Sequence, residues 1–200
     1  MKNWFAVLFV SLSCLISAHG SIDVYIKFED ADNADVNITK GDSQDQTYNG
    51  NNGWFVLNGF SLGMQNTVNI GSISTGGGAG KATFDKVEIG KGTGEGSAKL
   101  LLACARGNHY DKVTIVVARA GTGSGGPGRI RIMQIELYLT FIESVKSEGA
   151  AGDDTMSETV VLAHGAQRTE FFTQTAQGAE QAAGFSEWSV VRNEASTITE

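Results

Sequence analysis

The chain has 200 residues and a formal net charge of −7, from 15 Lys and Arg against 22 Asp and Glu. This acidic balance excludes the basic face that nucleic-acid-binding proteins normally present. The 26 glycines and the single proline, Pro127, indicate many loops and strand ends and exclude a proline-rich linker.

Residues 1–20 are predicted to be a signal peptide. Lys2 supplies a positive start, residues 4–16 form an apolar run of about a dozen residues, and Ala18 and Gly20 are small enough for a cleavage site. The run is shorter than the roughly 18–20 apolar residues of a membrane anchor. We therefore expect an exported chain, periplasmic or extracellular, that begins near residue 21 and has no membrane anchor.

The mature chain is long enough for one domain with a single core. We assign residues 21–192 to this domain and expect residues 193–200 to be a frayed tail. Once Cys14 is removed, Cys104 is the only cysteine left, so no disulfide can form within the mature chain. An inert core thiol is the favoured interpretation of Cys104, and a reactive or intermolecular thiol is the alternative.

The first strands are predicted from alternation. Residues 22–28 alternate with period two, as in a half-buried strand, and residues 54–68 form a longer strand interrupted at Gly59 and Gly63. Between them, residues 29–52 form a polar loop rich in Asp and Asn. Its acidic residues do not follow the EF-hand calcium pattern, so we expect a solvated loop and no metal site.

A glycine-rich loop at residues 71–80 ends in Lys81. The phosphate-binding loop pattern requires Ser or Thr after the lysine, but Ala82 stands there. The next residues, 81–89, alternate like a strand and do not open a helix. We therefore expect no nucleotide and no other cofactor.

Residues 97–121 predict the one amphipathic helix and the strand after it. Ser97 is the expected N-cap, and Gly107 is expected to end the helix in the left-handed conformation. The apolar stripe consists of Leu100, Leu101, Cys104 and Ala105. The alternation of Val113, Ile115 and Val117 marks the strand.

The C-terminal half is predicted to contain only strands. Residues 129–145 form the longest one, with a bulge near Met133 and Gln134. Residues 158–162 and 168–173 are expected to be a hairpin, joined through residues 163–167. Residues 185–191 are expected to be the terminal strand. About eight strands and one helix indicate a mainly β fold, a barrel or a sandwich.

No constellation of catalytic residues emerges. His109 and His164 lie far apart, without the ligand spacing of a zinc site, and are interpreted as structural and as a loop residue. Ser124 lies in a glycine turn without a nucleophile elbow. We therefore expect no catalytic, metal or cofactor site and no enzyme.

Taken together, these segments resemble the Hcp family, the hemolysin-coregulated proteins of type VI secretion systems. Residues 21–30 (SIDVYIKFED) are similar to the family's opening strand, and residues 53–63 to its next strand. Residues 97–121, with Leu-Leu-x-Ala-Cys-Ala, resemble its helix and following strand. The residues that mark the resemblance are Trp54, Lys81, Phe84, Leu101, Cys104, Tyr110, Lys112 and Arg119.

The resemblance implies a compact β-barrel of two antiparallel sheets with one short flanking helix. It also implies a structural subunit that forms hexameric rings, which stack into a tube and hold small effectors in the lumen, with sheath, spike and effector proteins as partners. A closed ring requires head-to-tail contacts. Two features depart from the family: the signal-like residues 1–20 and the longer polar insertion at residues 41–52. The alternative is an exported paralogue that acts as an extracellular binding or adhesin-like module.

Overall fold

A computed structural model describes residues 21–68, 79–123 and 126–200. Its elements in chain order are β1 (Ile22–Ala31), η1 (Ala34–Val36), η2 (Gly50–Asn52), β2 (Trp54–Leu57), β3 (Gly59–Ser61), β4 (Met64–Val68), β5 (Ala79–Phe84), β6 (Val87–Gly92), α1 (Ser97–Arg106), β7 (His109–Gly123), β8 (Gly126–Glu148), β9 (Ser157–Gln174) and β10 (Glu180–Ser189). The predicted signal peptide and most of the predicted glycine loop lie outside the described residues.

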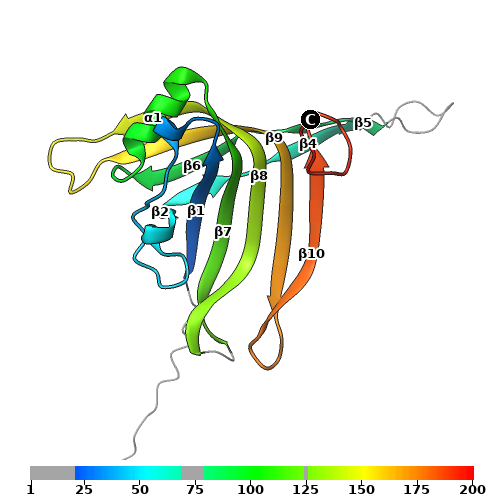
Figure 1. The fold of residues 1–200 in the computed structure, drawn as a ribbon. Helices are drawn as coiled ribbons and strands as arrows, with labels where there is room; N and C mark the ends of the chain where they lie inside the picture. Colours follow the sequence, from blue (N-terminus) through cyan, green and yellow to red (C-terminus); the bar gives the residue numbers. More distant parts are fainter. Residues whose placement is uncertain (1–20, 69–78, 124–125) are drawn as a thin grey trace, which may run out of the picture.

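The strands form one large antiparallel sheet and one small one. The large sheet has the order β2-β1-β7-β8-β9-β6-β3, with β10 added to β9, and β4 pairs with β5 separately. Figure 1 shows the large sheet curling into a half-barrel, with α1 at one end and the long strands β7, β8, β9 and β10 running away from it. The predicted fold class, a mainly β fold of two sheets with one flanking helix, is confirmed.

The curl comes from a bend shared by β8 and β9. Leu139 has a left-handed backbone (φ +49°) and interrupts the ladder at the place where Gly165 stands in β9. Below the bend β9 pairs with β10, and above it β9 pairs with β6. The predicted hairpin through residues 163–167 is therefore wrong. An alternating pattern with small residues at its centre fits a bent continuous strand as well as a hairpin.

Two other predicted strands are divided. The segment 54–68 is three strands, β2, β3 and β4, with breaks beside Gly59 and Gly63, where interruptions were expected. The segment 81–89 belongs to β5 and β6, which lie in different sheets. The extra residue in β8 is Ile132, one position from the predicted bulge, because Val117 pairs with Met133 and Ala118 with Arg131.

Helix α1 closes one end of the core. Leu100 and Ala103 are fully buried, whereas Leu101, predicted to pack on the core, is 48% exposed. The N-cap is Gly96 in the left-handed conformation, so the prediction that Ser97 is the N-cap is wrong. The hydroxyl of Ser97 is instead engaged by Lys91 and Glu158. Gly107 ends the helix with φ +73°, as predicted.

The C-terminal residues, expected to be frayed, lie against the bend. The backbone N–H groups of Val190 and Val191 donate to the carbonyl of Gly165, and the N–H of Ser189 donates to Glu194. The Ser189 hydroxyl donates to the carbonyl of Ile198 at 2.6 Å. These residues therefore bind the backbone of β9 at Gly165, between the half of β9 that pairs with β10 and the half that pairs with β6. Within the described ranges, no helix has the length and hydropathy of a membrane span.

Candidate assembly surface

The long strands present one apolar and one polar face. Alternation sends Ile135 and Leu137 of β8 into the core, and it sends their neighbours to the opposite side. By strand register, this polar face contains Lys27, Glu29, Lys112, Thr114, Gln134, Glu136, Tyr138, Arg168, Glu170, Phe185 and Glu187. Most of these side chains are only half exposed, so their charges must be paired locally.

Two arginines on the polar face bind β10 to its neighbours. Arg131 makes two hydrogen bonds to Glu180 through Nε (3.0 Å) and Nη2 (2.7 Å), and its guanidinium lies 4.0 Å from the centre of the Phe172 ring. Arg168 repeats the arrangement with Glu187 at 3.1 Å and the Phe185 ring at 3.9 Å. Each arginine thus combines a carboxylate with an aromatic face, a geometry suited to its planar guanidinium.

Two carboxylates of this face, Glu29 and Glu180, are held ionised. Partial burial opposes the charge of Glu180, but hydrogen bonds from Arg131 outweigh burial and lower the pKa of this carboxyl. The pKa of Glu29 is also lowered, because bonds from Lys27 and Lys112 outweigh its burial. Burial first, and then the nearby Glu136, raise the pKa of the Tyr138 phenol to about 12. Glu29 and Glu180 therefore keep their paired charges through the physiological range.

The polar loop between β1 and β2 is anchored to this face by aromatic and ionic contacts, which we call the clasp: Tyr25, Tyr48, Trp54 and the Arg129 pairs. The Tyr48 ring stacks on Tyr25 with centroids 4.7 Å apart, and Trp54 meets Tyr48 edge-on. Arg129 bonds Asp45 at 2.6 Å and also pairs with Asp23. The loop expected to be solvated is thus tied down by aromatic and ionic contacts.

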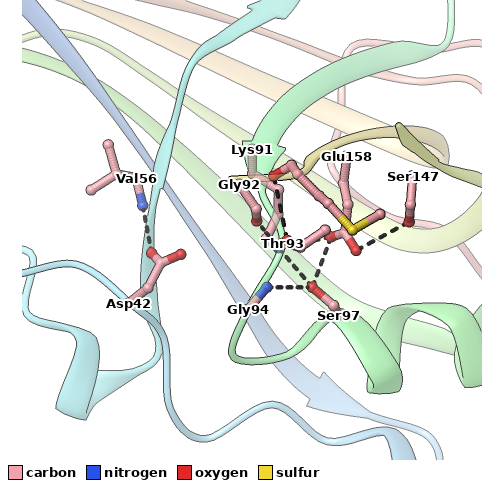
Figure 2. Close-up of polar contacts among 10 residues, drawn as sticks. Asp42, Val56, Lys91, Gly92, Thr93, Gly94, Ser97, Ser147 and Glu158 are labelled. Carbon is pink, nitrogen blue, oxygen red and sulfur yellow. Dashed lines mark hydrogen bonds and ion pairs between the residues drawn. The ribbon is translucent and has the colours of Figure 1, made fainter. Parts of the chain in front are cut away.

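Two outer strands of the large sheet, β2 and β10, differ in how their free edges are treated. At β2 the outer edge is covered, because the Ser43 N–H donates to Trp54 O (3.1 Å) and the Val56 N–H donates to Asp42 Oδ1 (3.1 Å), the latter drawn in Figure 2. At β10, which branches from β9 beside the path that continues to β6 and β3, no described strand pairs with the outer edge, and residues 180–186 are all exposed. Natural proteins usually cover or blunt such edges. The open edge of β10 is therefore the natural place for another chain to attach.

A buried ion pair fixes α1 to the sheet (Figure 2). Lys91 of β6 and Glu158 of β9 are 2.9 Å apart, with side chains 0% and 2% exposed. The Lys91 ammonium also donates to Gly92 O (2.7 Å) and Ser97 Oγ (3.1 Å), so all three protons have acceptors. Glu158 accepts from Ser97 (2.8 Å) and Ser147 (3.4 Å). Full pairing makes this burial of two charges tolerable.

The eight marker residues are spread over the fold and do not form one site. Tyr110 is fully buried and donates to Val36 O at 2.9 Å. Cys104 is half-buried against the core, with Sγ 3.5 Å from Glu143 O. Trp54 belongs to the clasp, and Leu101 points to solvent.

The other markers are equally dispersed. Phe84 meets the His164 ring edge-on, Lys112 pairs with Glu29 at 3.3 Å, and Arg119 donates to Gln174 at 2.8 Å. Lys81 lies in β5. His164, interpreted from the sequence as a loop residue, stands within β9, and burial lowers its pKa to about 4.

Sequence reasoning missed the paired charges of the polar face and the Lys91–Glu158 pair. Charged residues alternating with isoleucine in residues 129–137 were a usable signal for the first. Nothing local marks the second, because 67 residues separate its partners. In the part of the chain that the structure describes, no group of three or more His, Cys, Asp and Glu is arranged to hold a metal ion.

Comparison with known proteins gives a consistent result. Residues 25–171 match the protein family described as "Type VI secretion system effector, Hcp". Protein hcp1 of Pseudomonas aeruginosa is 25% identical over 100 residues, which are 50% of this chain and 59% of that protein. The match thus spans less than two thirds of this relative's length.

Solved structures share the fold. One described as a type six secretion system protein has a TM-score of 0.74 at 21% identity, over 88% of this chain and 100% of its own. Hcp1 from Salmonella typhimurium has a TM-score of 0.60 at 15% identity, over 88% and 99% of the two chains. At these identities the likeness concerns the fold.

Proposed function

The chain belongs to the Hcp family of type VI secretion system proteins, and on this premise we propose that it is the structural subunit of a tube, in which six copies close into a ring and rings stack. The match over residues 25–171, which includes α1, β7, β8 and most of β9, carries this proposal. The open edge of β10 supports it, because this edge offers a surface to a second chain. Contacts of that surface with a different surface of the next copy would be head-to-tail, the arrangement that closes into rings.

The polar face is our candidate for the channel wall. Its charges are paired within the subunit, through Arg131 with Glu180 and Arg168 with Glu187, so few remain to hold a passing protein. A wall of this kind suits the passage of small effector proteins. In this proposal sheath and spike proteins surround and cap the stacked rings, and the role is structural and not catalytic.

Light scattering and negative-stain imaging of the purified full chain test the ring. We expect particles of six subunits with an open centre at micromolar concentration. A protein that stays monomeric, or that stops at a dimer through isologous pairing of two β10 edges, would refute the ring.

Export is a separate proposal that rests on residues 1–20. Intact mass of the protein recovered from culture supernatant and from the periplasm should show the loss of about twenty N-terminal residues. An uncleaved N-terminus would refute the prediction that residues 1–20 are a signal peptide. A cleaved protein that stays monomeric would favour the exported binding module over the tube.

A further inference from the structure

A groove lies between the β4–β5 pair and β10. It has a volume of about 160 Å³ and is lined mainly by apolar atoms. The residues that form it are Met64, Ala82 and Phe84 from β4 and β5, and Gln167, Ser186, Glu187 and Trp188 from β9 and β10. Sites for cofactors and drug-sized ligands have volumes of roughly 300–1,000 Å³. The groove is therefore sized for one inserted side chain of a protein.

Unpaired polar atoms gather around this groove. Trp188 Nε1 and Gln167 Oε1 are buried and have no hydrogen-bond partner among the described residues, although Gln167 donates through Nε2 to Thr169 at 3.0 Å. Thr140 Oγ1 and both ring nitrogens of His164, farther along the same strands, are also unpaired. Buried polar groups in finished proteins nearly always have partners. This region is therefore incomplete in the isolated chain.

Exposed apolar side chains lie at the groove and near the C-terminal end of β10. Met64 is 56% exposed on the rim of the groove. Val191 and Ile198 are 57% and 51% exposed near the end of β10, where the Val191 N–H donates to the Gly165 carbonyl and the Ile198 carbonyl accepts from the Ser189 hydroxyl. A large exposed apolar side chain at a recess, such as Met64, is typical of a protein-binding surface. The one charged side chain at the groove, Glu187, is already paired with Arg168.

The groove is continuous with the open edge of the large sheet. Gln167 and Trp188 are register partners on β9 and β10, and β10 is the strand whose outer edge no described strand covers. A chain that docks along β10 therefore meets the groove as well. The outer edge of β2 is covered by the preceding loop. A second copy therefore cannot dock by pairing its β2 with the open edge of β10.

We propose that this groove receives an apolar side chain of the next copy of the chain, whose neighbouring backbone carbonyl and N–H groups pair with Trp188 Nε1 and Gln167 Oε1, and that it is the anchor of the contact between subunits. The inference rests on the proposed ring and names the surface through which it closes. A buried side chain at the centre of an interface, surrounded by a polar rim, is the usual form of an energetic hot spot.

The test compares two methionines of similar exposure. Met64→Asp places a charge at the groove, and Met156→Asp places the same charge in the β8–β9 connection, where Met156 is 48% exposed. We expect Met64→Asp to raise the subunit concentration needed for assembly at least tenfold by light scattering, and Met156→Asp to leave it unchanged. Ala82→Leu, which fills the groove with an apolar group, should also weaken assembly, and circular dichroism verifies the fold of each variant.

A second readout follows the groove itself. In a Trp4→Phe/Trp54→Phe background, Trp188 is the only tryptophan, and its emission should shift to shorter wavelength as the subunits assemble. Normal ring formation by Met64→Asp and Ala82→Leu, with unchanged Trp188 emission, would refute the groove as the anchor of the contact. The proposal that the chain forms rings would stand. A wild-type chain that never assembles would overturn the ring, and with it the second copy as the occupant of the groove.

Discussion

Lys91 is the residue whose environment is most tightly specified. Its ammonium has three acceptors in a site without solvent access, and its stem lies beside Phe55, with Nζ 5.5 Å from the ring centre. Such a pair adds little net stability when intact, but the loss of one partner leaves the other charge buried alone.

We therefore expect Lys91→Met to lower the free energy of unfolding by about 3–5 kcal/mol, measured by urea denaturation. The double variant Lys91→Met/Glu158→Leu should recover most of the loss, because no charge then remains buried. Lys146→Met is the control, since the Lys146–Glu148 pair is 69% and 57% exposed and should contribute less than about 1 kcal/mol. A double variant no more stable than the single one would contradict this account.

His164 gives the protein a pH dependence. Burial lowers its pKa to about 4 in the folded chain, whereas an unfolded histidine has a pKa near 6.5. The unfolded state therefore binds the proton first, and stability is complete above about pH 6.5 and falls as the pH decreases toward 4. The loss is at most about 3 kcal/mol.

The measurement is the free energy of unfolding between pH 7 and pH 4. His164→Leu should flatten the slope in this window, and His109→Asn, which changes the histidine beside Asp32, should retain the contribution of His164. An unchanged slope in His164→Leu would assign the pH dependence to other groups.

At the scale of elements, the turn before α1 depends on one glycine. Gly96 has φ +82°, and a Cβ at this position would lie 2.7 Å from the Phe55 ring. The left-handed backbone and the close contact both exclude a side chain, and each costs about 1–3 kcal/mol when forced.

Gly96→Ala should therefore destabilise the fold by at least about 2 kcal/mol in thermal or urea unfolding. Gly94→Ala in the same turn should cost less than about 1 kcal/mol, because a Cβ at Gly94 meets nothing within 4 Å. Equal losses in the two variants would show that the turn tolerates any side chain.

The predicted elements succeeded where their signals were local. The alternation of residues 22–28 identified β1, and Gly107 identified the end of α1. The prediction failed at residues 163–167, where a hairpin and a bent strand have the same pattern. Only the pairing of β9 with β6 on one half and β10 on the other distinguishes them.

At the scale of the whole molecule, the C-terminal residues close the gap where the sheet divides. Ser189 bonds to Glu194 and Ile198, and a Cβ at Gly165 would lie 3.1 Å from Thr199. These contacts connect the end of the chain to the middle of β9. Their loss should be felt by the entire fold and not by the tail alone.

Truncation after Val191 should lower the free energy of unfolding by about 1–3 kcal/mol, since at least two hydrogen bonds and their packing are lost. Removal of Glu200 alone is the control and should have no measurable effect. A truncated chain as stable as the full one would show that residues 192–200 contribute nothing to the fold, as a frayed tail would.

The sequence by itself determined the mainly β class, the place and end of the helix, and the family. These depend on periodicity within a segment, on a single glycine, or on the order of segments along the chain. Only the tertiary structure decided the single bent sheet, the open edge of β10, the groove beside it and the Lys91–Glu158 pair. Each of these joins residues dozens of positions apart, and which distant strands meet is settled by packing around a common core, which no local pattern records.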